Sequence, residues 1–267
     1  MGFLRALCPL CVLLATLACM SSPDPITAAG RELVWSDEFD RAGLPDPARW
    51  SYDVGGHGWG NKEMQFYTAD RPENARVEGG HLIVEARREN WQGSAYTSAR
   101  LVTKRKGDWT YARIEARARL PKGRGSWPAI WMLATTAGEM SWPDDGEIDL
   151  MEHVGFDQGV VHGSIHTKAY NHRIGTQKTA NTRVADASDA FHVYAIEWDE
   201  SRIRWFVDDR EFFSFANERA GKDVWPFDGP FHLLVNLAVG GTWGGQKGVD
   251  DAAFPMRMEL DYVRVYR

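Results

Sequence analysis

Short stretches in which apolar and polar residues alternate dominate the chain from about residue 31 onward. Between residues 112 and 120, every even position is alanine, isoleucine or leucine, and every odd position is arginine or glutamate. This period of two predicts a β-strand with one buried face. Gly79-Gly80 predicts a hairpin turn inside the stretch 77–86, and Asp208-Asp209 predicts another. Further strands are predicted at 33–35, 161–167, 191–198, 203–208, 231–239 and 258–266.

The pattern predicts an all-β fold. No stretch shows a long helical period of 3.6 residues, and turn residues separate the predicted strands at short intervals. Many short strands of this kind are typical of a sandwich of two antiparallel sheets. We therefore expect one domain, spanning residues 31–267.

An acidic strand is the most informative segment. Glu147 and Asp149 are two positions apart and share a strand face, but a regular strand would send Glu152 to the opposite face. A β-bulge at Leu150-Met151 would absorb one residue and return Glu152 to the side of the other two carboxylates. We predict that bulge, with Ile148 and part of the Leu-Met pair in the core.

Crowded carboxylates on one strand face have two readings. The ordinary one is a solvated surface. However, like charges repel and acidic residues are depleted from strands, so crowding of this kind favours metal binding or paired-carboxylate acid/base chemistry. Trp127, Trp131 and Trp142 lie nearby in the sequence, and tryptophan rings beside carboxylates suit a sugar ring.

Several segments together resemble glycoside hydrolase family 16, in particular its bacterial laminarinase-like endo-β-1,3-glucanases. The bulged spacing Glu-x-Asp-x-x-Glu resembles that branch, whereas the family's lichenases have one residue fewer. The resemblance covers nearly the whole chain after the leader, and the segments that carry it are residues 36–40, 59–61, 96–100, 127–133, 146–155 and 236–241.

The resemblance implies a β-jelly roll whose concave sheet forms the substrate cleft, and hydrolysis with retention of anomeric configuration. It implies that Glu147 is the nucleophile and Glu152 the general acid/base, with Asp149 between them. Retaining glycosidases use two carboxyl groups about 5–5.5 Å apart. Carboxylates this close do not all ionise easily, which raises at least one pKa, as a general acid requires.

Substrate-binding residues are also expected. Trp127 and Trp131, four positions apart, share one strand face, and the resemblance places them beside the sugar nearest the cleavage point. His166 lies on the polar face of the next strand. The remaining positions expected to contact the substrate are Asn61, Arg100, Asn236 and Trp243. Lys62, Met64 and Phe66 depart from the family pattern beside Asn61, and His153 and Trp142 receive no assigned role.

No cofactor is required for this chemistry. The resemblance implies a possible structural calcium ion, because Glu38, Gly80 and Asp261 match the positions that bind it in the family. Oxygen ligands of this kind suit a hard cation.

The N-terminus predicts export. Residues 1–19 combine Arg5 with a short apolar run, as in a signal peptide, and residues 20–30 read as a linker. Leu17-Ala18-Cys19 also resembles a lipoprotein box. Two alternatives therefore stay open: a protein that is freely secreted or periplasmic, and a protein anchored by a lipid on Cys19. All three cysteines lie in this leader, which leaves residues 31–267 without disulfides.

The expected partner is a polysaccharide, a β-glucan, bound by a monomer. The formal net charge of −6 argues against nucleic acid or an anionic membrane surface as the main partner. Three other readings stay open: a non-catalytic β-glucan-binding protein; a carboxylate metal site that includes Asp144 and Asp145; or an enzyme of the same family acting on mixed-linkage β-1,3-1,4-glucan or galactan, or as a transglycosylase.

Overall fold

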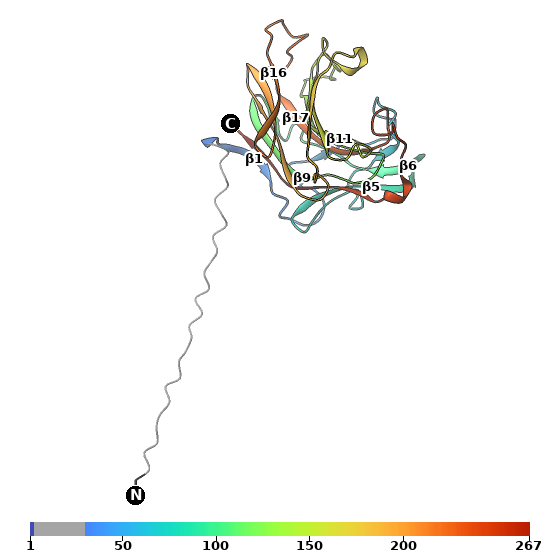
Figure 1. Cartoon of the computed structure of the whole chain (residues 1–267), viewed down its shortest axis with the longest axis vertical. Coiled ribbons are helices and arrows are strands. Elements are labelled where there is room, and N and C mark those ends of the chain that lie inside the picture. Colours follow the sequence, from blue (N-terminus) through green and yellow to red (C-terminus); the bar gives the residue numbers. More distant parts are fainter. Residues whose placement is uncertain (3–29) are drawn as a thin grey trace.

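Two β-sheets packed face to face contain nearly all the regular structure (Figure 1). The computed structural model describes residues 1, 2 and 30–267. The larger sheet has ten strands in the order β16 (Arg210–Ala216), β15 (Arg202–Val207), β14 (His192–Trp198), β9 (Ala112–Arg119), β18 (Met256–Tyr266), β5 (His81–Trp91), β6 (Ser94–Ser98) and β3 (Gln65–Tyr67), with β1 (Leu33–Asp37) beside β18 and β4 (Ala75–Glu78) beside β5.

The second sheet, called the cleft sheet below, has eight strands. Their order is β13 (Lys178–Arg183), β12 (Val160–His166), β11 (Glu147–His153), β10 (Ser126–Ala134), β17 (Phe231–Val239), β7 (Arg100–Val102) and β2 (Ser51–Tyr52), with β8 (Asp108–Trp109) beside β17. Two short 3₁₀ helices, η2 (His172–Ile174) and η3 (Asp251–Ala253), lie in the loops between strands. The predicted all-β sandwich is confirmed, and both predicted hairpins form, as β4–β5 and β15–β16. One pair, β3 with β6, is parallel rather than antiparallel.

The hydrophobic core lies between the sheets. The even positions of β9, including Ile114, are buried as the alternation predicts, and they face inward. Strand β17 is buried along its whole length, because it is central in its sheet, with one face on the core and the other at the bottom of the cleft. This continuous burial holds the floor of the cleft in place.

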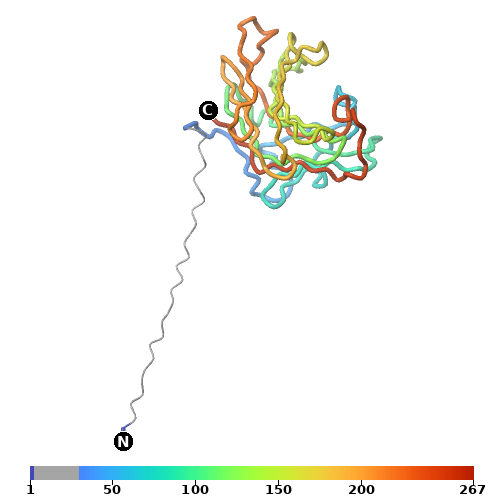
Figure 2. The backbone as a smooth tube through the Cα atoms, viewed as in Figure 1, coloured from blue at the N-terminus to red at the C-terminus, as the bar shows by residue number. Residues whose placement is uncertain are grey.

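Strands β1 and β18, near the two ends of the folded region, run antiparallel beside each other, with Leu33 opposite Tyr266 (Figures 1 and 2). Most of the predicted signal peptide, the predicted lipid-attachment residue Cys19 and most of the linker fall in residues 3–29, outside the described residues. In the described part of the chain, no helix has the length and apolar character needed to span a membrane.

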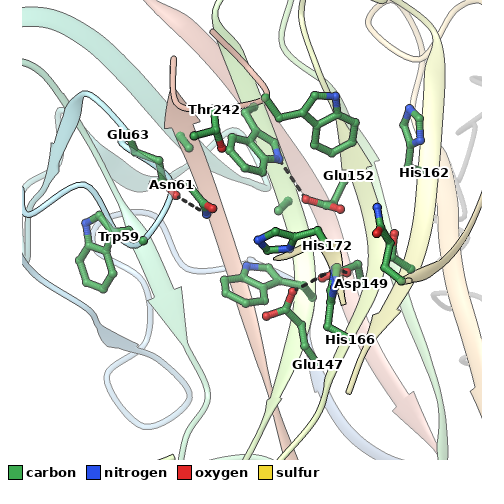
Figure 3. A pocket seen from close by; sticks show the side chains of 18 of the residues that line it. Trp59, Asn61, Glu63, Glu147, Asp149, Glu152, His162, His166, His172 and Thr242 are labelled. Atoms are coloured by element: carbon green, nitrogen blue, oxygen red, sulfur yellow. Dashed lines mark hydrogen bonds and ion pairs between the residues drawn. The ribbon is translucent and has the colours of Figure 1, made fainter. Parts of the chain in front are cut away.

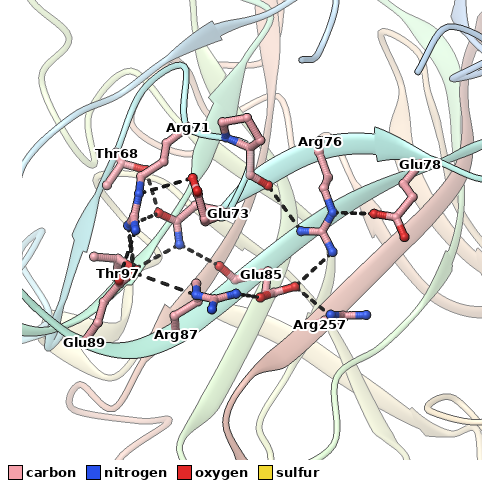
Figure 4. A network of polar contacts seen from close by, with 12 residues as sticks. Thr68, Arg71, Glu73, Arg76, Glu78, Glu85, Arg87, Glu89, Thr97 and Arg257 are labelled. Carbon is pink, nitrogen blue, oxygen red and sulfur yellow. Dashed lines mark hydrogen bonds and ion pairs between the residues drawn. The ribbon is translucent and has the colours of Figure 1, made fainter. Parts of the chain in front are cut away.

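A charge network joins β4, β5 and β18 (Figure 4). The Glu85 side chain is fully buried, although the alternating pattern alone gives no sign of it. Arg76 Nη2 lies 3.1 Å and Arg257 Nε 2.7 Å from Glu85 Oε2, and Arg87 binds the other oxygen. A buried charge needs compensating partners of this kind, so the three arginines make the buried carboxylate tolerable.

Candidate active site

The predicted bulge forms in β11. Asp149 pairs with Ser164 and Glu152 with His162 on β12, so Leu150 and Met151 together oppose one residue. Leu150 and Met151 are both buried, whereas only part of this pair was expected to lie in the core. That one opposing residue is Gly163, where a Cβ would lie 2.6 Å from the Trp205 ring. The absence of a side chain there lets Trp205 approach, and its indole N–H donates to the Asp149 carbonyl at 2.7 Å. The opposite sheet therefore supports the bulge.

All three carboxylates line one cleft on the cleft sheet (Figure 3). The bulge returns Glu152 to the side of Glu147 and Asp149, as predicted. The cleft runs across the strands, from the loop containing Trp59 and Asn61, past β17, β10 and β11, to β12 and β13.

Glu147 lies between a hydrogen-bond donor and a histidine. Trp142 Nε1 donates to Glu147 Oε2 at 2.8 Å, and His166 Nε2 lies 3.6 Å from Glu147 Oε1. Burial and the nearby Asp149 charge raise the pKa of Glu147, whereas His166 and the Trp142 hydrogen bond oppose the rise. Burial therefore destabilises the ionised form of Glu147, and the Trp142 N–H and His166 stabilise it.

Asp149 is the most buried of the three carboxylates, with 3% of its side chain exposed. Burial raises its pKa, and a hydrogen bond with Glu147 opposes that rise. His166 Nε2 lies 3.4 Å from Asp149 Oδ2. Single ligand atoms of Glu147, Asp149 and His166 all lie within 4.8 Å of one another, a spacing that would also suit a cation. Two carboxyl groups this close and this buried do not both ionise easily, which favours acid/base chemistry.

Glu152 has a different environment. Trp127 Nε1 donates to Glu152 Oε1 at 3.0 Å, and no ion-pair partner lies within 4.0 Å among the described residues. Burial and the Asp149 charge raise the pKa of Glu152. The Trp127 N–H and His166 oppose that rise, but His166 lies within 4.0 Å of Glu147 alone.

Aromatic rings form part of the cleft walls. Trp127 meets Trp243 edge to face with centroids 5.5 Å apart, and Trp243 meets His162 in the same way at 4.9 Å. Each of the seven residues predicted to bind substrate lines the cleft; their contacts with a sugar stay predictions. The seven are Asn61, Arg100, Trp127, Trp131, His166, Asn236 and Trp243.

Arg100 lies between two tryptophans. Its guanidinium carbon is 4.6 Å from the Trp59 ring centroid and 4.8 Å from that of Trp131, and its Nε donates to Asp53 Oδ2 at 2.9 Å. Cation–π contacts on two rings and an ion pair hold the guanidinium in place.

Sequence reasoning missed several cleft residues. Trp142, left without a role, contacts Glu147 and stacks with Arg173, whose guanidinium carbon lies 4.3 Å from the ring centroid. Neither Arg173 nor its neighbour His172 was singled out, because both follow β12 in a segment without strand periodicity. Glu63 was also missed, because it follows a turn at Asn61 and Lys62, where strand alternation gives no signal.

His153 lies outside the cleft lining. It is fully buried, and its Nε2 accepts the Gly159 backbone N–H at 3.1 Å. Burial lowers the pKa of His153 to about 4, which keeps the ring neutral. Its role is structural.

The positions predicted for calcium have other partners. Both oxygens of Glu38 accept hydrogen bonds from Arg264, at 3.0 and 2.7 Å. Asp261 pairs with Arg117 at 2.6 Å. The expected site uses backbone oxygens and a single carboxylate near the C-terminus, so only the Asp261 pairing bears on it, and the calcium ion stays a prediction. Asp145, part of the alternative metal site, pairs with Lys222 at 2.8 Å.

Comparison with known proteins identifies close relatives. The family model described as "Glycosyl hydrolases family 16" matches residues 62–264. The beta-glucanase of Rhodothermus marinus is 64% identical over 243 residues, which cover 88% of this chain and 85% of that protein. The X-ray structure of the laminarinase from Rhodothermus marinus matches with a TM-score of 0.87 and 64% identity, covering 89% of this chain and 97% of that chain. SCLam, described as a non-specific endo-beta-1,3(4)-glucanase, matches with a TM-score of 0.86 and 47% identity, covering 90% and 92% of the two chains.

Proposed function

The chain belongs to glycosyl hydrolases family 16, and we propose that it is a retaining, endo-acting β-1,3-glucanase. The observation that carries this proposal is the bulge in β11, because it places Glu147 and Glu152 on one side of the strand, in one cleft. Two carboxyl groups that flank a glycosidic bond are the minimum machinery for its hydrolysis.

In the proposed first step, the Glu147 carboxylate attacks the anomeric carbon. The bond from that carbon to the bridging oxygen breaks, and Glu152 transfers its proton to the leaving oxygen. In the second step, Glu152 removes a proton from water, the water oxygen bonds to the anomeric carbon, and Glu147 leaves as a carboxylate. Two inversions at one carbon restore its original configuration.

The surroundings of the two glutamates support this division of roles. Glu147 receives the Trp142 N–H and faces His166, so its ionised form has two supporting groups. Burial and the Asp149 charge raise the pKa of Glu152, whereas the Trp127 N–H and His166, which lies farther than 4.0 Å away, oppose the rise. The nucleophile must start ionised and the acid must start protonated, and the histidine within 4.0 Å of Glu147 alone favours ionisation of Glu147 first. Asp149 and Glu147 have carboxylate oxygens within 4.8 Å of each other, so the repulsion between their charges disappears when Glu147 becomes an ester.

A glucan chain suits the cleft. Tryptophan rings stack on the apolar faces of pyranose units, and the predicted sugar contacts extend on both sides of β11. A cleft that crosses the sheet accepts an internal segment of a polymer, which supports endo action. The relatives named as a beta-glucanase and a laminarinase support β-glucan as the substrate class.

The linkage preference is tested by a substrate panel. Purified protein is incubated with laminarin, curdlan, lichenan and agarose, and the products are analysed by size and by the anomer first released. We expect short β-1,3-linked oligosaccharides of retained configuration from laminarin. A faster reaction on lichenan would favour the mixed-linkage enzyme, for which the relative described as a non-specific endo-beta-1,3(4)-glucanase is a specific reason. Binding of laminarin without any products would favour a non-catalytic glucan-binding protein.

We also propose that the protein is exported. On the sequence pattern of residues 1–19, the enzyme is secreted, periplasmic or lipid-anchored through Cys19, and it acts on its polysaccharide as a monomer.

Replacing Trp142 with phenylalanine tests the support of the nucleophile. Trp142→Phe keeps an aromatic ring but removes the N–H that donates to Glu147. That hydrogen bond lowers the pKa of Glu147, so its loss raises the pKa further. Because the nucleophile must be ionised, we expect the acidic limb of the kcat/KM profile to move to higher pH, by about one unit for a hydrogen bond to a charged group.

The matched control is Trp91→Phe, at the end of β5 and outside the cleft lining. It should leave the profile unchanged. An acidic limb that stays in place in Trp142→Phe would show that the indole N–H does not act on the nucleophile.

A further inference from the structure

We propose that Glu63 is a positioning residue for the sugar-binding wall of the cleft. Its carboxylate ends a hydrogen-bond chain that orients Asn61, Asn236 and Trp131 toward a β-1,3-linked glucan. The inference rests on the proposed function for the identity of the sugar, and it assigns a role to a buried acid that the hydrolytic steps do not use.

The segment 61–67 presents alternate residues to the cleft side. Asn61, Glu63, Gln65 and Tyr67 are partly or fully buried, whereas Lys62 and Met64, between them, are exposed. These two, together with Phe66, are the departures from the family pattern. Lys62 and Met64 therefore point away from the buried polar side chains of this segment.

Hydrogen bonds run in one direction from Trp131 to Glu63. Trp131 Nε1 donates to Asn236 Oδ1 at 2.7 Å, Asn236 Nδ2 donates to the Tyr67 hydroxyl at 3.0 Å, and that hydroxyl donates to Glu63 Oε2 at 3.2 Å. The indole N–H only donates, so it fixes which end of the Asn236 amide faces it. The other end of the amide is a donor, so the Tyr67 proton must point to Glu63.

The end of this chain requires an acceptor. Besides Tyr67, the Gln65 amide donates to Glu63 Oε2 at 2.7 Å. The Asn61 amide donates to Glu63 Oε1 at 3.3 Å, a contact that Figure 3 shows. An ionised carboxylate accepts from all three, whereas a glutamine would turn an NH₂ group toward at least one donor. Gln65 is itself held, because its Oε1 accepts the Val239 N–H at 2.8 Å.

The chain acts on two groups that were predicted to touch sugar. Asn61 is held directly by Glu63. Trp131 is held at its N–H by Asn236 and on its face by Arg100, so the ring has little freedom to turn. A wall held in its binding orientation before the sugar arrives loses less entropy on binding. Glu63 therefore contributes to affinity without taking part in bond cleavage.

The test measures sugar binding in the absence of turnover. Glu63→Gln, Tyr67→Phe and the double variant are made in a Glu147→Gln background, and calorimetry gives the Kd for β-1,3-linked gluco-oligosaccharides. The same variants with Glu147 intact give kcat and KM on laminarin. Lys62→Gln is the matched control, since it changes an exposed residue on the other side of the segment. Melting curves check that each variant folds.

We expect each single variant to weaken binding about tenfold, as for the loss of one hydrogen bond to a charged group. KM should rise while kcat is nearly unchanged, and Lys62→Gln should match the parent. The double variant should lose little more than the larger single loss, because both substitutions break the same chain. If Glu63→Gln fails to fold, Tyr67→Phe, which removes a single hydroxyl, decides.

Unchanged affinity in folded Tyr67→Phe and Glu63→Gln would overturn the proposal. A fall in kcat with affinity intact would also overturn it, because Glu63 would then act on the chemistry. The proposed function fails separately, if the wild-type enzyme binds these oligosaccharides but cleaves none of the polymers.

Discussion

Glu147→Gln and Glu152→Gln are each expected to reduce laminarin hydrolysis by more than about 10³-fold, because a nucleophile or a general acid normally supplies at least that much. Both side chains keep their size and both retain an indole N–H neighbour, from Trp142 and Trp127 respectively. The measurement is kcat on laminarin for each variant. Activity within about tenfold of the wild type in either one would contradict the assignment.

Thermal stability provides the control for folding, with a sign that can be worked out. Burial raises the pKa of Glu147 and of Glu152, so the folded protein holds these protons to higher pH than the unfolded chain does. Ionisation then costs stability as the pH rises from about 4.3, the unfolded value, through the raised pKa. Glutamine does not ionise. Each variant should therefore melt above the wild type near pH 8 and close to it below about pH 4.

A variant that melts far below the wild type at both pH values would show that its low activity reflects misfolding. A difference in melting temperature that does not change with pH would show that the carboxylates are not strained by burial.

Deletion of Met151 is expected to leave a folded protein with about 10²-fold lower activity. The segment would become Glu-Ile-Asp-Leu-Glu, which alternates regularly and keeps both glutamates on the cleft side without a bulge. Their relative position would change by a fraction of a residue rise, and a misplacement of about 1 Å can cost roughly 10²-fold in rate. Met151 is fully buried, so we also expect a loss of about 2–5 kcal/mol in the free energy of unfolding.

The matched control is Met151→Ala, which truncates the same buried side chain but keeps the bulge. It should lose similar stability while retaining most of the activity. Equal losses of activity in the two variants would show that the side chain, rather than the bulge, positions the carboxylates. A deletion variant with full activity would show that the extra residue has no role in catalysis.

The sequence alone was sufficient for local features of this protein. A period of two along a strand is a property of neighbouring residues, so the strands, the hairpin turns at Gly79-Gly80 and Asp208-Asp209, and the two-sheet class were predicted and confirmed. The bulge was predicted for the same reason, because three carboxylates at this spacing share a face only if one residue is absorbed between Asp149 and Glu152.

The tertiary structure decided which distant groups meet. Asn236 donates a hydrogen bond to Tyr67, which lies 169 positions away in the sequence, and Tyr67 donates to Glu63. Glu63 and Tyr67 belong to a segment that the sequence analysis noted only for its departures from the family pattern. Trp142 could not be assigned from sequence, because its N–H reaches Glu147 only through the path of the loop before β11. The buried Glu85 likewise obtained two of its three arginine partners, Arg76 and Arg257, from other strands, and the Glu38 carboxylate obtained Arg264 from β18.

The physical reason is the range of the interactions involved. Hydrophobic alternation is set by backbone geometry within a few residues, and the printed sequence displays it directly. The stabilisation of a buried charge or a buried N–H depends on which partner the folded sheets bring within hydrogen-bond distance, and strand order and register decide that. The sequence thus determined where the three carboxylates point, and the tertiary structure determined what surrounds them.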